Sequence, residues 1–395
     1  MSFYDVLQRG DEFILKDRPK RSRIWNFFSH ATCMAVVGGS KAILGLFYNV
    51  NVKGLDNLDH GLAKARAENR GFLTLMNHMS VCDDPFIWAC LPWRYFLSLD
   101  DIRWGLAASN ICFNSKASST FFSLGKLFAC ERFGRGPFQG GLDALVRILS
   151  PDDTLDTDHI FQGTEKSVPV GSPLATDVRS FYSPRYTPPV LRYKTSWVHI
   201  FPEGYVCQLK PPHNNSMRFF RWGTARLILE PTVAPVVVPI FTDGFEKIVP
   251  EAKVDDVVDS VLPQGIGSTI TVNIGKALDD RIIEAFRAEW RALCDKYHDK
   301  FHPNDLSFEL KFGKEAEALR SRVCDYLREK VAQLRLENGF PPEDERLKSQ
   351  KFWSEYTKTD GASAPDIQFV GYNWAVRAYQ KNTKTYDEYG NEISK

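Results

Sequence analysis

The stretch from Gly71 to Pro85 constrains the fold most, because a nearly continuous apolar run ends there in polar residues. The run Phe72–Met76 has the length and composition of a strand that is buried on both faces. Asn77 and His78 follow it, and Asp84-Pro85 is typical of a helix N-cap and first helical residue. The stretch therefore predicts a buried strand that ends at His78, with Asp83 facing the imidazole across a strand-to-helix turn.

Three further apolar runs predict strands, and amphipathic segments separate or follow them. The strands are expected at Thr195–Ile200, Ala234–Ile240 and Gly267–Ile274, and the helices at Leu142–Leu149, Met217–Glu230, Asp280–Phe301 and Asp305–Asn338. Alternation of this kind is typical of an α/β fold with a mixed or mostly parallel sheet flanked by helices. Met217–Leu229, which is rich in Phe, Trp and Arg, fits either a core helix or a helix at a lipid interface.

Composition along the chain predicts five regions. They are a polar and basic leader (1–23), an apolar segment (24–50), an α/β domain (51–278), a C-terminal extension of amphipathic helices (279–338) and a polar tail (339–395). Residues 151–190 are rich in Pro, Ser, Thr and Asp and have no sustained periodicity, which indicates a surface insertion within the domain.

The apolar segment 24–50 is long enough to span a membrane only if His30, Gly38-Gly39 and Lys41 are tolerated inside it. We expect a helix, or two short helices broken at Gly38-Gly39, that lies in one leaflet with the basic cluster of the leader near anionic headgroups. The alternative is a buried helix of a soluble domain.

Charge and cysteine usage exclude several classes of function. The formal net charge of +1 gives no argument for nucleic-acid binding. The eight cysteines form no Cys-x-x-Cys pair, so a zinc ribbon or a redox motif is not expected. We expect no metal and no cofactor. The 28 Phe and 9 Trp fit a large core or a protein at a lipid interface.

The pair of His78 and Asp83 has the chemistry of a general base held by a carboxylate. No Gly-x-Ser-x-Gly elbow is present, and Ser80 is too close in sequence to His78 to serve as its nucleophile. A substrate hydroxyl that attacks an acyl carbonyl is therefore favoured. Two alternatives remain: a metal-dependent phosphoesterase, which would need more ligands than His199 supplies, and a structural histidine beside an N-cap aspartate.

Two other segments suggest what this pair acts on. Phe201-Pro202-Glu203-Gly204 also follows a predicted strand, and Glu203 there can hold a headgroup hydroxyl or brace an arginine. Arg132 lies in a Gly-rich loop that includes Gly134, where the backbone can approach a phosphate closely. The alternative for Arg132 is a solvated loop charge. A phospholipid substrate is favoured by this combination: two strand-end sites, an arginine suited to phosphate and the apolar segment 24–50.

These motifs together resemble the glycerolipid acyltransferase superfamily, the PlsC-like enzymes. The resemblance rests on four stretches in order: His78-x4-Asp83, the Arg132 loop, Phe201-Pro202-Glu203-Gly204 and Val238-Pro239-Ile240. Within the superfamily the chain is similar to the tafazzin family over roughly residues 1–335. The matching stretches are NHMSxxDDP from Asn77, IRW from Ile102, NICF from Asn110, FFSLGK from Phe121, WVHIFPEG from Trp197 and RFFRWG from Arg218, and the leader resembles fungal members.

The resemblance implies an acyltransferase of the 1-acylglycerophosphocholine type. It implies a CoA-independent phospholipid–lysophospholipid transacylase that remodels cardiolipin, with monolysocardiolipin as acceptor and phosphatidylcholine or another phospholipid as donor. It also implies monotopic attachment to the mitochondrial outer and inner membranes, facing the intermembrane space, and association with mitochondrial membrane complexes.

The same resemblance assigns roles to residues. His78 and Asp83 would be catalytic, and Asn77, Ser80, Arg132, Gly134, Phe201, Pro202, Glu203, Gly204 and Pro239 would bind substrate. An acyl-CoA-dependent lysophospholipid or glycerophosphate acyltransferase is the nearest alternative. A membrane-shaping protein that keeps the fold without catalysis is another.

Overall fold

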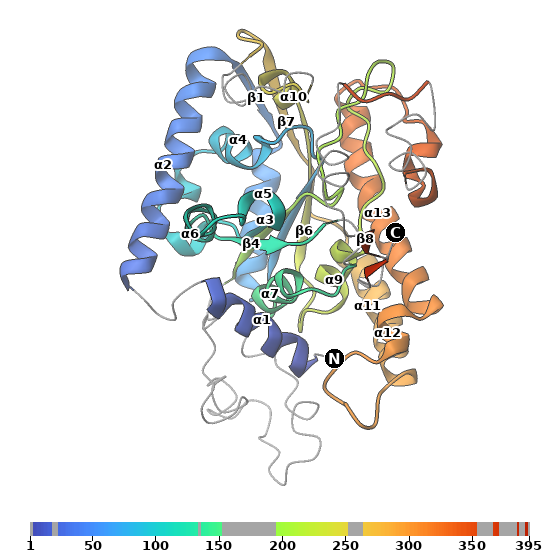
Figure 1. Cartoon of the computed structure of the whole chain (residues 1–395). Coiled ribbons are helices and arrows are strands. Elements are labelled where there is room, and N and C mark those ends of the chain that lie inside the picture. Colours follow the sequence, from blue (N-terminus) through green and yellow to red (C-terminus); the bar gives the residue numbers. More distant parts are fainter. Residues whose placement is uncertain are drawn as a thin grey trace.

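A mixed sheet runs through the middle of the structure, a computed structural model that describes residues 3–17, 23–132, 136–151, 195–251, 264–353, 366–370, 385–386 and 392–393 (Figure 1). Its strand order is β1-β7-β6-β2-β5. All neighbours are parallel except β6 and β7. The strands are β1 (Asn49–Lys53), β2 (Phe72–Met76), β5 (Trp197–Ile200), β6 (Val236–Asp243) and β7 (Thr269–Ile274).

A parallel pair, β3 (Gly105–Ala108) and β4 (Leu127–Cys130), continues this sheet beyond β5. The connection is a parallel bridge between Trp104 and Val198, in which Trp104 N donates to Trp197 O at 2.7 Å and His199 N donates to Trp104 O at 2.8 Å. Strands β6, β2, β5, β3 and β4 therefore point the same way, and their carboxyl ends lie along one edge of the sheet.

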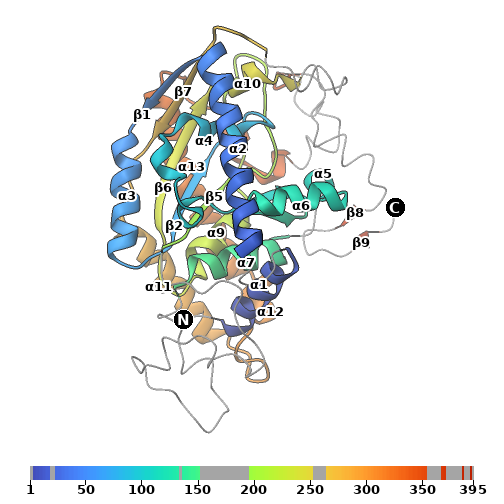
Figure 2. The same ribbon diagram turned by 90° about the vertical axis from the view of Figure 1, so that its left-hand side faces the viewer.

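Helices cover both faces of the sheet, as Figures 1 and 2 show. They are α1 (Tyr4–Asp17), α2 (Arg23–Phe47), α3 (Leu55–Ala67), α4 (Asp83–Cys90), α5 (Ser109–Cys112), α6 (Lys116–Leu124), α7 (Gly140–Leu149), α9 (Trp222–Leu229), α10 (Phe245–Ile248), α11 (Asp280–Lys296), α12 (Phe308–Phe312) and α13 (Lys314–Glu337). Short 3-10 turns lie at η1 (Trp93–Tyr95), η2 (Leu99–Asp101) and η6 (Glu345–Lys348), and a small ladder pairs β8 (Thr385–Tyr386) with β9 (Glu392–Ile393).

Alternate residues of the central strands enter two separate cores. Leu73 and Leu75 of β2 pack with α1, α7, α9, α11 and α13, whereas Phe72 and Met76 pack with α2, α3 and α4. All five residues of β2 are buried. Burial on both faces is what parallel strands require, because crossover helices cover each side. The α/β fold with a mostly parallel sheet, predicted from the apolar runs, is confirmed.

The predicted polar leader is wrong as a description of residues 4–17, which form α1. This helix packs on α7 below the sheet in Figure 1, and Val6, Leu7 and Ile14 are buried in the core. Asp11 accepts a hydrogen bond from Arg147 Nε at 3.0 Å, and neither side chain is exposed. One polar residue of the leader, Asp11, thus forms a buried ion pair with Arg147 of α7. Most of its basic cluster lies outside the described residues.

Helix α2 runs through Gly38-Gly39 without a break, so the predicted division into two helices is not observed. One side of α2 packs on α4 and α6, while Phe27 and Phe28 on the other side are 69% and 54% exposed. Among the described helices, α2 is long and apolar enough to cross a membrane by length and composition, a test that packed core helices also pass. Whether it spans or lies in one leaflet stays a prediction.

Two expectations about the second half of the chain need correction. The helix expected to begin at Met217 begins at Trp222, and its residues Gly223–Leu229 are all buried, so α9 is a core helix and not an interfacial one. The expected polar tail contains a packed segment: Trp353 is fully buried, and Phe369 bridges to Leu209. The predicted insertion lies almost entirely outside the described residues.

Candidate active site

The candidate site lies at the carboxyl edge of the parallel strands. His78 follows the end of β2, the segment Phe201–Gly204 follows β5, and Arg132 follows β4. Because these strands are parallel, segments that are far apart in the sequence meet at one edge. The topology therefore accounts for the grouping that the motifs suggested.

His78 and Asp83 face each other as the sequence predicted. His78 Nδ1 lies 2.8 Å from Asp83 Oδ2. The same carboxylate oxygen accepts hydrogen bonds from the backbone N–H groups of Met79 at 2.6 Å and Ser80 at 3.0 Å. Since Oδ2 only accepts, the hydrogen bond places the imidazole proton on Nδ1 and leaves a lone pair on Nε2. No described residue hydrogen-bonds to Nε2.

Asp83 is completely buried, and its electrostatics follow from that. Burial raises the pKa of the Asp83 carboxyl, while the His78 ring and the N–H groups of Ser80 and Met79 act to lower it. The second oxygen, Oδ1, has no hydrogen-bond partner among the described residues. All of the carboxylate's polar contacts are therefore directed at holding the turn and the imidazole.

The His78 ring is held on its other side by Phe201. The two rings stack with centroids 4.4 Å apart and an interplanar angle of 26°. The side chain of His78 is 19% exposed, so the ring is reachable from outside although its carboxylate partner is not. A carboxylate at one edge and an aromatic face together fix the direction in which Nε2 points.

Glu203 braces the loop that carries His78. Its two carboxylate oxygens accept hydrogen bonds from His78 N at 2.7 Å and from Arg218 N at 3.0 Å. Burial raises the pKa of the Glu203 carboxyl to about 8, and these two N–H donors act in the opposite direction. Because Glu203 is fully buried, its predicted contact with substrate is replaced by a structural role, one of the two readings that the sequence allowed.

Three other residues predicted to contact substrate are buried in the scaffold instead. The Asn77 amide pairs with the backbone of Thr242, accepting from its N at 2.8 Å and donating to its O at 2.9 Å, which ties β2 to β6. Ser80 is buried in the turn, where its Oγ accepts from Cys82 N at 3.3 Å. Pro239 lies inside β6 opposite Leu75. All three residues are buried in this structure.

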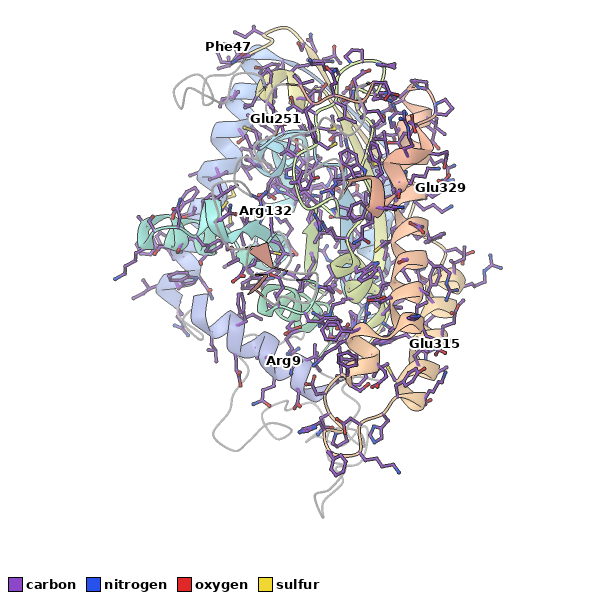
Figure 3. All side chains as sticks on the ribbon, turned by 45° about the vertical axis from the view of Figure 1, so that its right-hand side comes forward. Arg9, Phe47, Arg132, Glu251, Glu315 and Glu329 are labelled. Atoms are coloured by element: carbon purple, nitrogen blue, oxygen red, sulfur yellow. The ribbon has the colours of Figure 1, made fainter. Side chains whose placement is uncertain are left out.

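The remaining predicted contacts lie at or near the edge. Pro202 is buried, and Gly204 adopts the left-handed conformation with φ of 82°, which favours glycine. Arg132 Nη2 donates to Asn110 Oδ1 at 3.3 Å, and burial lowers the pKa of this guanidinium. Asn110 belongs to α5, and Figure 3 marks the position of Arg132. Gly134 lies outside the described residues.

The start of α4 differs from the prediction. The helix begins at Asp83 with Cys82 as its N-cap, so Asp84 is not the cap. Asp84 instead pairs with the buried Arg103, and its Oδ1 accepts from Trp88 Nε1 at 3.1 Å. The turn is set by Asp83, which caps the backbone of Met79 and Ser80 while it holds the histidine.

Two groups of described residues bear on the metal-dependent alternative. His199 is buried, its Nδ1 lies 2.8 Å from Thr74 Oγ1, and burial holds the pKa of its ring well below the usual value. In the described part of the chain, His213, Asp344 and Asp366 bring ligand atoms within 4.8 Å of one another. Arg346 already forms ion pairs with both of those carboxylates.

Comparisons with known proteins identify the family. The sequence profile described as "Acyltransferase" matches residues 49–242, a range that includes His78, Asp83, Arg132 and the segment Phe201–Gly204. The chain is 50% identical over 382 residues to tafazzin of Saccharomyces cerevisiae, a match that covers 96% of this chain and 97% of the yeast protein. The chain belongs to the tafazzin family.

Other relatives are more distant from this tafazzin-family chain. It is 31% identical over 218 residues to the N-acylphosphatidylethanolamine synthase of Arabidopsis thaliana, covering 55% of this chain and 60% of that protein. The crystal structure of the 1-acyl-sn-glycerophosphate acyltransferase PlsC from Thermotoga maritima matches with a TM-score of 0.36 and 13% identity, covering 82% of this chain and 90% of that chain. Membership in the family makes this chain an acyltransferase.

Sequence reasoning missed the residues that follow the Phe201–Gly204 segment. Arg218 donates from its backbone to Glu203, and its guanidinium lies 3.7 Å from the centroid of the Tyr205 ring and 5.1 Å from that of Trp353. Arg221 caps α9 and lies against Gly204. Arg218 and Arg221 were visible in the sequence, but both readings of Met217–Leu229, a core helix or a helix at a lipid interface, placed them on a helix and not at the site.

Proposed function

We propose that this chain is a CoA-independent phospholipid–lysophospholipid transacylase in which His78 is the general base. The observation that supports this most strongly is the hydrogen bond of 2.8 Å from His78 Nδ1 to the buried Asp83, which leaves Nε2 as an acceptor on a partly exposed ring. A base in that position can take a proton from a lipid hydroxyl at the sheet edge.

The proposed step transfers one acyl group and consumes no water. The hydroxyl oxygen of the lysophospholipid attacks the ester carbonyl of the donor phospholipid, and its proton moves to His78 Nε2. The tetrahedral intermediate collapses by breaking the bond to the donor's glycerol oxygen, which takes the proton back from Nε2. The products are the acylated acceptor and a lysophospholipid from the donor, and His78 is neutral again.

Asp83 and Glu203 support this step without touching the lipids. Asp83 keeps the proton on Nδ1 and stabilises the imidazolium that forms transiently. Glu203 fixes the backbone at His78, so Nε2 is positioned before substrate binds. Arg132 would bind a phosphate group near the reacting hydroxyl.

The specific lipids are part of the proposal. The tafazzin relationship supports monolysocardiolipin as acceptor and phosphatidylcholine as donor, and hence remodelling of cardiolipin at mitochondrial membranes that face the intermembrane space. The exposed aromatic side of α2 supports attachment to one leaflet. Replacing Phe27 and Phe28 by serine should reduce cosedimentation with cardiolipin-containing vesicles severalfold, and unchanged cosedimentation would argue against α2 as the attachment site.

The decisive experiment follows a labelled acyl chain. Purified full-length protein is mixed with monolysocardiolipin and phosphatidylcholine that carries an isotope-labelled acyl chain, without CoA, and label is measured in cardiolipin. We expect transfer without CoA and no stimulation by acyl-CoA. Transfer that occurs only with acyl-CoA would instead establish the acyl-CoA-dependent alternative.

A further inference from the structure

Arg221 is attached to the Phe201–Gly204 segment through both its backbone and its side chain. Its backbone N–H donates to Pro202 O at 2.9 Å. A Cβ placed on Gly204 would lie 3.2 Å from Arg221 Nε and 3.5 Å from its Cγ. The side chain of Arg221 therefore lies over the turn that follows β5, next to the residue that braces the His78 loop.

The guanidinium of Arg221 has no hydrogen-bond or carboxylate partner in the described part of the chain. Two buried arginines nearby are paired with carboxylates, Arg226 with Asp143 and Glu230 and Arg328 with Glu343. The side chain of Arg218 donates instead to the backbone oxygen of Glu203 at 3.3 Å. A half-buried charge without a partner is costly unless a ligand of opposite charge completes the site. The guanidinium carbon of Arg221 lies 5.4 Å from the centroid of the Phe219 ring, and no carboxylate among the described residues neutralises its charge.

The surroundings of Arg221 are cationic. Burial, together with the charges of Arg218 and Arg132, lowers the pKa of Arg221 to about 10, whereas Tyr205 and Cys130 act in the opposite direction. Cys130 and Tyr205 also influence Arg132, so the two guanidinium groups share these neighbours at the ends of β4 and β5. Arg132, Arg218 and Arg221 lie close enough for their charges to act on one another, and no described carboxylate pairs with Arg221. Such a group of cationic side chains favours an anionic ligand.

We propose that Arg221 binds the phosphate of the acceptor lipid over Gly204 and acts with Arg132 as the second guanidinium of one anion site. The inference rests on the proposed function, because it assigns the substrate's phosphate to a place beside the proposed base. A guanidinium presents paired N–H donors that match phosphate oxygens. Gly204 has no side chain, which lets the side chain of Arg221 lie directly against the turn. No covalent bond forms or breaks at Arg221.

Acceptors with and without a phosphate test this assignment. At saturating labelled phosphatidylcholine, the KM for lysophosphatidylglycerol should rise on the order of tenfold to a hundredfold in Arg221→Gln. The KM for monoacylglycerol, which offers a hydroxyl but no phosphate, should not change. Arg221→Lys, which keeps a point charge, should give an intermediate KM. The matched control is Arg281→Gln, which removes a guanidinium that is 90% exposed on α11.

Glycerol 3-phosphate provides a second readout that does not depend on turnover of monoacylglycerol. It should inhibit transfer to lysophosphatidylglycerol competitively in the native protein, and its inhibition constant should rise in Arg221→Gln. An equal loss with both acceptors, an unchanged KM for lysophosphatidylglycerol, or an unchanged inhibition constant would overturn the proposal. Failure of the general-base proposal is distinguishable, because it would appear as transfer retained in His78→Ala with either acceptor.

Discussion

Replacement of Asp83 by asparagine separates the charge of this residue from its geometry. The asparagine oxygen should take the place of Oδ2, because the alternative orientation would turn its NH2 group toward the N–H groups of Met79 and Ser80. The NH2 group then occupies the position of Oδ1, which has no described hydrogen-bond partner. All three hydrogen bonds are kept, and the His78 proton stays on Nδ1. Only the negative charge is lost.

The size of the effect follows from the contact that remains. The charge-assisted hydrogen bond becomes a neutral one, which should reduce the stabilisation of the transient imidazolium by at least about 1.4 kcal/mol. That loss corresponds to a factor of about ten in rate. A full charge pair about 4 Å apart in a medium of intermediate dielectric constant is worth about 4 kcal/mol, a factor of about a thousand. We therefore expect kcat to fall between roughly tenfold and a thousandfold.

The assay measures acyl transfer between vesicle lipids over a range of pH, with circular dichroism to verify folding. A fall of about ten thousandfold in a folded variant would indicate that the proton has moved to Nε2, as when a triad aspartate becomes asparagine. A fall of less than about threefold would refute a role for the charge.

Two other predictions concern the residues behind His78. Burial raises the pKa of Glu203 from 4.5 to about 8, so between these pH values the native chain keeps a proton that the unfolded chain releases. The free energy of unfolding should therefore fall by about 3 to 5 kcal/mol as the pH rises from 4.5 to about 8. Urea titrations of Glu203→Gln should lack this decrease; a parallel decrease would assign it elsewhere. Trp353→Ala should lower the free energy of unfolding by about 3 to 5 kcal/mol and reduce transfer, because the fully buried ring packs on Arg218. Trp353→Phe should recover most of both, and full activity in the alanine variant would separate the tail from the site.

The parts of the fold that the sequence predicted depend on local patterns. The apolar run of β2 and the polar residues after it specify a strand, a turn and a helix within a short stretch of chain. The contact between His78 and Asp83 joins residues only five apart. Parallel topology then brings the other strand ends to the same edge, so the loops that carry the ordered motifs lie together there.

The parts that the sequence did not predict depend on contacts between distant residues. Asp11 and Arg147 are 136 positions apart, and each has the composition of a solvated charge until α1 docks on α7. Likewise, the segment before Trp222 has a helical pattern, but the backbone N–H groups of Arg218 and Arg221 are used by Glu203 and Pro202. Those tertiary hydrogen bonds delay the start of α9 and direct two arginines toward the site.

Burial also separates residues that bind from residues that brace. The motifs grouped Asn77, Ser80, Glu203 and Pro239 with the substrate contacts, since a motif records only that a residue type is needed. The structure places all four inside the scaffold, where their partners are backbone groups or neighbouring strands. No pattern in one sequence distinguishes a buried glutamate that accepts two N–H bonds from one that binds a headgroup.

The most direct test of the central claim compares His78→Ala with the native protein on the same vesicles. Label transfer from phosphatidylcholine to monolysocardiolipin and cosedimentation with the vesicles are measured in parallel. If His78 accepts the proton of the lipid hydroxyl, transfer falls on the order of a hundredfold to ten thousandfold while vesicle binding is unchanged. Transfer within about threefold of the native rate, with binding intact, would contradict the account.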